Sequence, residues 1–487
     1  MSMNDKTTKM NEEAVARAFS WDGISISKLR SAFMGQVIGP DDEGYDEARA
    51  VFYGGIDRRP AVIIRPVDDN EVSLVVSLAR QTGLELAVRS GGHSVAGHSL
   101  VDGGIVLDLS DMRKLDIDVD GRTAWAEAGL TAGEYTQAAA AYGLATGFGD
   151  TASVGLGGLT TGGGIGYLVR KYGLTIDDLL AAEVVTADGR ILRVDDHTEP
   201  DLFWAIRGGG GNFGVATRFQ FRMHELKNVT GGMLILPAEA DVISGFMAAA
   251  DAAPEELSTI ANVMPAPPMP FLAPEHHGKL VILAMLVYAG EGAAAEAALA
   301  PFRKLAAPLA DMLKPMPYPE IYPPDDPSYH PVAVARTMFL ERVDSGVAGT
   351  ILEHLKGAKA SFAVAQLRML GGAMARVPVE ATAFAHRKSR IMVNLAALYE
   401  KPEEKSTHDK WVTDFAAALR QTDDGAYVNF LGDEGPQLVR AAYPSPTWER
   451  LVAVKRKYDP TNLFHFNQNI PPAGDASLAS ATGGGAA

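Results

Sequence analysis

The chain of 487 residues contains no cysteine. It therefore can form no disulfide bond, and it lacks the thiolate that serves as a nucleophile or as a soft metal ligand. His276 and His277 are adjacent, which is neither the spacing of a zinc finger nor that of a metal-binding helix face. We expect no metal site.

Positive charge and long apolar runs are also scarce. Lys and Arg together number 44 against 60 Asp and Glu, which gives a formal net charge of −16. An acidic surface repels phosphate backbones, and no Lys/Arg-rich run is present, so we expect no nucleic-acid partner. No run of about 18 apolar residues could cross a membrane, and residues 1–9 lack the apolar segment of a signal peptide. We expect a cytoplasmic protein without a membrane partner, and its oligomeric state stays open.

Glycine, in contrast, is abundant, with 50 residues. The first glycine-rich segment is Arg89-Ser-Gly-Gly-His93, which continues to His98 between two apolar runs. Adjacent glycines let the backbone approach a ligand closely, and successive N–H groups form a concave site for an anion such as a pyrophosphate. His93 lies at the tip of this loop. For an isolated histidine a purely structural role is the more common one, but two further glycine-rich loops follow.

The second loop spans residues 147–166 and the third spans residues 207–214. Gly209–Gly214 fits the pattern G-x-G-x-x-G, which in a nicotinamide-binding fold follows a strand and opens a helix. Here the order is reversed, because residues 200–206 indicate a helical turn and residues 215–222 alternate like a strand. The third loop therefore does not predict a nicotinamide site.

Together the three loops, the string at residues 162–174 and the C-terminal run at residues 457–471 resemble flavoproteins of the vanillyl-alcohol-oxidase type. Within that type the chain is most similar to the berberine-bridge-enzyme-like oxidases, over about residues 39–472. The resemblance implies an α+β fold: a two-lobed PCMH-type FAD-binding domain and a substrate domain with a large antiparallel sheet flanked by helices. It also implies that His93 is bonded covalently to FAD.

The resemblance further assigns cofactor-binding positions. They are Arg89, Ser90, Gly91, Gly92, Ser94, His98 and Ser99 in the first loop, Thr151, Ser153, Val154, Gly155, Gly158, Gly162, Gly164 and Gly166 in the second, and Val215, Asn467 and Asn469. For His98 a ligand-facing and a structural role are equally open. Many family members attach FAD a second time through a cysteine, and alignment places Thr151 at that position. Because a hydroxyl does not replace a thiol, FAD is held through His93 alone or without any covalent bond.

The catalytic polar groups are less clear. In plant members a glutamate or glutamine base follows a His-Arg pair, and the matching residue here is Asn394, whose amide cannot accept a proton at neutral pH. Two family tyrosines correspond to Ile165 and Phe430. Tyr427 and Tyr443, like Tyr399, could be a phenolic base or a substrate contact, although ordinary packing is the more common role for any one of them. Val154 matches a family position that controls oxygen access, or it is a packing residue.

We therefore expect an FAD-dependent oxidoreductase that transfers a hydride from a hydroxyl- or amine-bearing carbon of a small molecule to flavin N5. Reoxidation by O2 would yield H2O2. Two alternatives stay open. The enzyme could be a dehydrogenase that uses another electron acceptor, or the missing polar groups could mark a flavin- or ligand-binding protein with impaired catalysis. The sequence does not identify the substrate.

The expected organisation is a tail or helix over residues 1–38, an FAD-binding domain over 39–230, a substrate-binding domain over 231–440, a return to the FAD domain over 441–472 and a disordered tail over 473–487. Helical periodicity predicts helices near residues 69–82, 131–142, 200–206, 240–252, 292–306 and 407–421. Strands are expected near residues 61–66, 84–89, 105–109, 123–128, 180–186, 190–194, 215–222, 279–288, 366–376 and 390–399.

Overall fold

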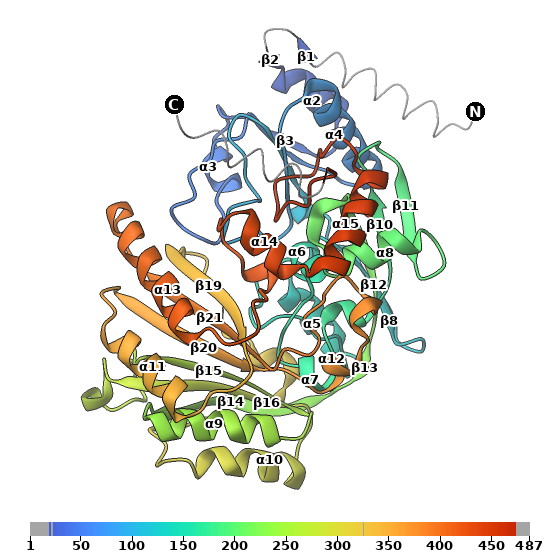
Figure 1. The fold of residues 1–487 in the computed structure, drawn as a ribbon. Coiled ribbons are helices and arrows are strands. Elements are labelled where there is room, and N and C mark those ends of the chain that lie inside the picture. Colours follow the sequence, from blue (N-terminus) through green and yellow to red (C-terminus); the bar gives the residue numbers. More distant parts are fainter. Residues whose placement is uncertain (1–18, 21–22, 325, 474–487) are drawn as a thin grey trace.

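The computed structural model describes residues 19–20, 23–324 and 326–473. Its elements form an α+β fold in which a large antiparallel sheet lies beside smaller sheets (Figure 1). Of the terminal tails expected from the sequence, residues 1–18, 21–22 and 474–487 lie outside the described residues. The N-terminal elements are β1 (Phe19–Ser20), β2 (Gly23–Ile24), α2 (Ile26–Ala32), β3 (Gln36–Ile38) and α3 (Tyr45–Ala48).

A four-stranded sheet carries the first glycine loop. Strands β4 (Val62–Arg65) and β5 (Leu86–Arg89) run parallel to β6 (Ile105–Asp108), which lies between them, and β3 pairs antiparallel with β4. Helix α4 (Asp69–Thr82) connects β4 to β5. Ligands of parallel sheets bind beyond the carboxyl ends of the strands, and the first glycine loop starts at the carboxyl end of β5.

The second sheet is antiparallel. Along the chain, its strands lie before and after the other two glycine loops. In order across the sheet its strands are β11 (Ile191–Asp195), β10 (Leu179–Val185), β12 (Val215–Arg222), β8 (Thr123–Glu127) and β7 (Leu115–Asp118). The nearby elements are α5 (Ala132–Ala140), β9 (Leu144–Ala145), α6 (Leu156–Gly162), α7 (Val169–Tyr172), α8 (Pro200–Ile206) and β13 (His224–Glu225). One apolar core joins these two sheets with the C-terminal helices α14 (Pro436–Ala442) and α15 (Ser445–Tyr458).

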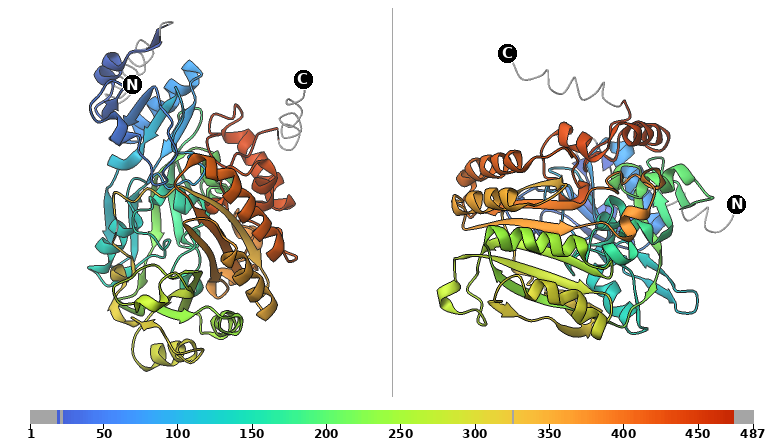
Figure 2. Two further views of the ribbon diagram at one scale, coloured as in Figure 1. Left: turned by 90° about the vertical axis from the view of Figure 1, so that its left-hand side faces the viewer. Right: turned by 60° about the horizontal axis from the view of Figure 1, so that its bottom comes forward.

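The large sheet lies in the lower half of Figure 1 and is antiparallel throughout. Its strands are, in spatial order, β17 (Ala310–Asp311), β14 (Asn228–Pro237), β16 (Leu280–Tyr288), β15 (Leu257–Pro265), β20 (Phe362–Met369), β21 (Ile391–Leu398) and β19 (Ala333–Leu340), and β18 (Lys314–Pro317) also pairs with β14. Four helices cover one face and share its apolar core (Figures 1 and 2): α9 (Ala240–Ala252), α10 (Ala293–Arg303), α11 (Ser345–Lys356) and α13 (Lys405–Leu419). Because side chains alternate along a strand, every second residue of this sheet faces away from these helices.

The structure corrects the expected strand over residues 366–376. Strand β20 ends at Met369, because Gly371 and Gly372 have φ values of 97° and 59°, in the left-handed region that an extended strand cannot use. Helix α12 (Ala373–Arg376) follows. Strands β14, β15 and β19 and helix α11 were not expected from the sequence. Short 3-10 helices lie at Leu109–Asp111, Thr175–Asp177, Gly210–Asn212, Pro274–His276, Tyr318–Ile321, Val379–Ala381, Pro402–Glu404 and Val428–Phe430.

Candidate active site

A cavity of about 550 Å³ lies between the glycine loops and the helix-free face of the large sheet. All three glycine loops contribute to its wall, together with strands β19, β20 and β21 and the C-terminal segment. Among the residues assigned to FAD from the sequence, the wall includes Ser90, Gly91, Gly92, His93, Ser94, His98, Ser99, Thr151, Val154, Gly155, Gly158, Val215 and Asn467. The fold therefore gathers into one cavity loops that are far apart in the chain.

The first and second glycine loops touch through their backbones. The Ser90 hydroxyl donates to the carbonyl of Ala128 at 2.6 Å and accepts from the N–H of Gly157 at 3.2 Å. A Cβ atom added to Gly91 would lie 2.3 Å from the nitrogen of Gly155, and one added to Gly155 would lie 2.2 Å from the nitrogen of Gly91. Both positions require glycine, because any side chain would push the two loops apart.

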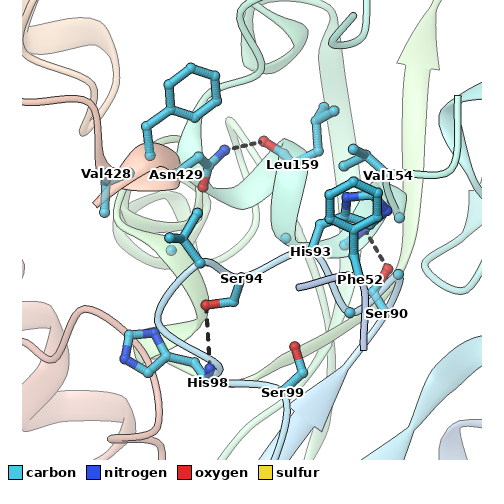
Figure 3. A pocket seen from close by; sticks show the side chains of 18 of the residues that line it. Phe52, Ser90, His93, Ser94, His98, Ser99, Val154, Leu159, Val428 and Asn429 are labelled. Carbon is cyan, nitrogen blue, oxygen red and sulfur yellow. Dashed lines mark hydrogen bonds between the residues drawn. The ribbon is translucent and has the colours of Figure 1, made fainter. Parts of the chain in front are cut away.

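His93 lies at the tip of the first loop and lines the cavity. Its ring stacks on Phe52, with ring centroids 4.3 Å apart and an angle of 20° between the planes, and Val154 lies beside the pair in Figure 3. Within the described residues, the backbone N–H groups of Gly92, Ser94 and Val95 donate no hydrogen bond. Gly92, Ser94 and Val95 all line the cavity, so their N–H groups are candidate donors to an anion there.

His98, the second histidine of this loop, is held from its backbone. Its N–H donates to the Ser94 hydroxyl at 3.3 Å (Figure 3). Burial, with a smaller contribution from the nearby cation Arg58, lowers the pKa of His98 to about 4. The His98 ring is therefore neutral at pH 7, and it can face a ligand as either a donor or an acceptor.

The remaining residues assigned to FAD from the sequence, Arg89, Ser153, Gly162, Gly164, Gly166 and Asn469, are not part of the cavity lining. Arg89 supports the first loop from outside by donating to the carbonyl of Ala48 at 2.5 Å, and burial lowers its pKa. Gly164 and Gly166 pack against other chain segments, since an added Cβ would lie 2.0 Å from the Thr175 hydroxyl and 1.6 Å from the Phe148 carbonyl, respectively.

The C-terminal segment is attached to the third glycine loop by a buried lysine. Nζ of Lys455 donates to Oδ2 of Asp459 and to the carbonyl of Asn212 at 2.8 Å, and to the carbonyl of Phe464 at 2.9 Å. The side chain of Asn212 donates to the carbonyl of Gln468 at 3.1 Å. Burial lowers the pKa of Lys455. These bonds place Asn467 at the cavity wall.

His465 lies in this segment. The residues around it alternate in polarity as in a strand, but the described chain forms no strand there. Nε2 of His465 lies 2.6 Å from a carboxylate oxygen of Glu85 at the surface. The alternation is misleading here because the segment is shaped by its bonds to α15 and to the third loop rather than by pairing with another strand.

The proposed catalytic residues separate into two groups. Asn394 and Tyr427 line the cavity, whereas Tyr443 does not and instead donates its hydroxyl to the carbonyl of Gly208 at 3.1 Å. The Tyr427 oxygen accepts from the N–H of Gly164 at 2.9 Å, and burial raises its pKa, which keeps this phenol protonated. Burial also raises the pKa of Tyr443. The structure thus does not bring Tyr443 to the site.

Asn394 lies on β21, directly opposite Gln366 of β20 and Thr337 of β19. Its Oδ1 atom is buried and has no hydrogen-bond partner in the described chain. Ile165 and Phe430, at the two positions where family tyrosines were expected, also line the cavity. The part of the wall that these residues form contains amide and apolar groups but no phenol.

Sequence reasoning missed an ion pair in the wall. Arg368 of β20 donates from Nη2 to Oδ2 of Asp150 in the second glycine loop at 2.5 Å, and from Nε to Oε1 of Gln366 at 2.9 Å. Asp150 is the one carboxylate among the described residues that line the cavity. Gln366 and Arg368 stand two positions apart in an otherwise apolar strand, which places both on one face, and this pattern could have been recognised.

Comparison with known proteins agrees with this geometry. A family model described as FAD binding domain matches residues 60–195, and one described as berberine and berberine like matches residues 426–471. The FAD-linked oxidoreductase YgaK of Bacillus subtilis is 31% identical over 454 residues, covering 91% of this chain and 98% of that protein. The chain belongs to the berberine-bridge-enzyme-like family of FAD-linked oxidoreductases.

A further sequence match and a structural match extend the likeness. The (R)-6-hydroxynicotine oxidase of Paenarthrobacter nicotinovorans is 30% identical over 92% of this chain and 99% of that protein. The crystal structure of 6-hydroxy-D-nicotine oxidase from Arthrobacter nicotinovorans superposes with a TM-score of 0.81 at 28% identity, covering 90% of this chain and 98% of that one. The family, the α+β fold class and the assignment as an FAD-dependent oxidoreductase, all expected from the sequence, are confirmed.

The cavity of this berberine-bridge-enzyme-like protein has the features that FAD requires. The N–H groups of Gly92, Ser94 and Val95 donate to no backbone carbonyl in the described chain, and they suit the negative charge of a pyrophosphate. Oδ1 of Asn467 is buried at the wall without a partner in the described chain, so it can accept a hydrogen bond from a bound ring system. These groups and the glycine loops would hold FAD beneath the sheet.

The described ranges of the chain contain neither a membrane-spanning helix nor a candidate metal cluster. None of their helices combines the length and the apolarity that crossing a bilayer requires. Within the same ranges, no three side chains of the His, Asp or Glu type gather closely enough to hold a metal ion.

Proposed function

We propose that this protein is an oxidase that carries FAD on His93 alone, oxidises a hydroxyl- or amine-bearing carbon of a small molecule, and uses O2 as the electron acceptor. The observation that most supports this proposal is the position of His93. It lies at the cavity wall, next in the chain to residues of the first loop whose N–H groups donate to no backbone carbonyl in the described chain. A relative named as an oxidase, (R)-6-hydroxynicotine oxidase, supports the choice. A cytoplasmic location and the domain boundaries expected from the sequence stay predictions.

A single covalent attachment is supported by the composition of the wall. The chain has no cysteine, and Thr151 stands at the position expected for the second attachment. The Thr151 hydroxyl lies 3.5 Å from Oδ1 of Asp150, within reach of a weak hydrogen bond. A hydroxyl is not a thiolate, so it offers no second nucleophile to the cofactor.

Bound FAD supplies hydride acceptance from carbon and electron transfer to O2. The chain contributes positioning and exclusion of water. The amide of Asn394 and the side chain of Gln366 offer hydrogen bonds to a substrate, while Ile165 and Phe430 provide apolar contact. Tyr427 stays a neutral phenol because burial raises its pKa, so it can donate a hydrogen bond but cannot accept the substrate's proton at neutral pH.

An anaerobic substrate screen tests this function. Flavin bleaching by an alcohol, sugar or amine identifies a substrate, and admitting air should then restore the yellow colour quickly with release of one H2O2 per flavin. Reoxidation over many minutes would instead favour the dehydrogenase. A stable flavin spectrum across the whole panel would favour the binding protein with impaired catalysis.

Val154 is the residue that we propose to leave room for oxygen, since it lines the same cavity as His93 and Phe52. Val154→Leu should slow reoxidation by about tenfold, which corresponds to about 1.4 kcal/mol in the barrier. Anaerobic reduction by substrate should stay nearly unchanged, and stopped-flow absorbance measures both steps. Val154→Ala is the matched control, because it enlarges the passage and should not slow reoxidation. Equal rates of flavin reoxidation by O2 in the wild type and in Val154→Leu would contradict the assignment.

A further inference from the structure

The cavity-lining residues that the sequence offered as the base, Asn394 and Tyr427, cannot accept the substrate's proton. Asn394 is an amide and Tyr427 is a protonated phenol. The cavity wall nevertheless contains a carboxylate, that of Asp150, whose side chain is 24% exposed while that of its partner Arg368 is only 5% exposed. The cation thus lies within the wall and the anion faces the cavity.

The position of Arg368 is fixed by its surroundings. Its Nε and Nη2 donate to Oε1 of Gln366 at 2.9 and 2.7 Å, and Gln366 in turn donates to Oδ1 of Asn262 at 2.9 Å. The guanidinium carbon lies 5.2 Å from the centroid of the Phe430 ring, which is favourable for a cation. These contacts hold the guanidinium against Asp150.

The hydrogen bonds of Asp150 leave capacity for a substrate. Its Oδ2 accepts from Arg368 at 2.5 Å, and its Oδ1 meets only the Thr151 hydroxyl at 3.5 Å among the bonds within the described chain. An ionised carboxylate has about four lone-pair sites, so Oδ1 can accept a strong hydrogen bond from a ligand. The carboxylate therefore offers an acceptor directed to the cavity.

Arg368 of the large sheet is the cation in contact with Asp150. Three tyrosines, Tyr53, Tyr167 and Tyr322, also lie near this carboxylate. Burial raises the pKa of Tyr53 to about 12 and also raises the pKa of Tyr167 and Tyr322, so these three phenols are neutral at pH 7. The ion pair with Arg368 is therefore the charged contact that can hold the carboxylate in place.

We infer that Asp150 is the catalytic base and that Arg368 is its positioning residue. The substrate is then a molecule with an O–H or N–H on the carbon that is oxidised. This O–H or N–H bond breaks and its proton passes to Oδ1 of Asp150, which becomes a carboxylic acid. The carbon gives its hydride, with two electrons, to FAD, and a C=O or C=N bond forms. The inference rests on the proposed function for its oxidant.

The first test replaces the base. Asp150→Asn keeps the shape of the side chain but cannot accept the proton, so the rate of anaerobic flavin reduction by substrate should fall by about 10²–10⁴-fold. Flavin content and reduction by dithionite should be unchanged. Failure of the proposed function would instead leave the wild type unreduced by every substrate. If substrate reduces the flavin of the wild type and of Asp150→Asn at the same rate, the inference is wrong.

The second test removes the positioning residue. Arg368→Met should slow anaerobic flavin reduction at saturating substrate by about 10- to 100-fold, because the carboxylate loses the contact that holds it in place. Arg368→Lys should restore most of the wild-type rate. Arg376→Met is the control, since Arg376 pairs with Glu255 at the surface and is 62% exposed. A purely structural ion pair would lower stability in Arg368→Met without changing the reduction rate at saturating substrate.

A third measurement does not depend on turnover. The infrared difference spectrum between the wild type and Asp150→Asn reports the protonation of this one side chain across a pH series of the FAD-loaded enzyme. A carboxylate band that is present in the wild type and absent from Asp150→Asn is the expected result. A carboxylic-acid band in the wild type at pH 7 would overturn the inference, because a protonated Asp150 cannot act as the base.

Discussion

His93→Ala is expected to release all of its FAD when the protein is denatured and precipitated with acid, whereas wild-type protein keeps its yellow colour in the pellet. His93 is the residue that we propose as the covalent link, and the absence of cysteine leaves no thiol to replace it. Absorbance of the pellet and of the supernatant measures the outcome directly. Peptide mass spectrometry would place the flavin on the peptide that contains His93.

In its native state the same variant should retain part of its FAD. The available N–H groups of Gly92, Ser94 and Val95 and the contact between the first two glycine loops do not depend on the imidazole. Substrate should reduce its flavin more slowly than in the wild type, because loss of the histidine bond removes its electron-withdrawing effect on the ring. His98→Ala is the control, because His98 lies in the same loop and should leave the link intact. Complete release of FAD from denatured wild-type protein would refute the covalent link.

Lys455→Met is expected to lower the free energy of unfolding by about 3–5 kcal/mol, the usual effect of removing one partner from a buried ion pair. Lys455 and Asp459 are both fully buried, with their charged atoms 2.8 Å apart. The variant also leaves the carbonyls of Asn212 and Phe464 without the ammonium donor. Urea unfolding followed by tryptophan fluorescence measures the shift of the midpoint.

Lys457→Met provides a matched control on the same helix. Lys457 pairs with Glu199 at 3.2 Å and with Asp201 at 3.0 Å, but its side chain is 53% exposed. Exposed pairs of this kind contribute about 0–1 kcal/mol, so the midpoint should move little. Equal midpoints for the two variants would show that the buried lysine does not stabilise the attachment of the C-terminal segment.

Local structure was well predicted where the signals are local. The expected helix over residues 69–82 coincides with α4, because the Asp68 side chain accepts the N–H of Glu71 at 2.9 Å at its start and Gly83, with φ 69°, ends it. The strand expected over residues 366–376 was too long, because apolar alternation continued past Met369 while the two following glycines turned the chain. Hydrophobic alternation gives no information on backbone φ.

The sequence by itself determined the family and excluded a cysteine link, and it pointed to the glycine-rich loops and to His93 as the residues that we propose to hold FAD. Each of these depends on which residues are present or on their order over a short segment. Only the tertiary structure showed that Tyr443 lies outside the cavity, that Arg368 reaches Asp150 across 218 positions, and that Lys455 bonds to Asn212 across 243. Such contacts depend on how the sheets and the C-terminal helices pack, and no local pattern in a single sequence reports the distance between side chains that packing brings together.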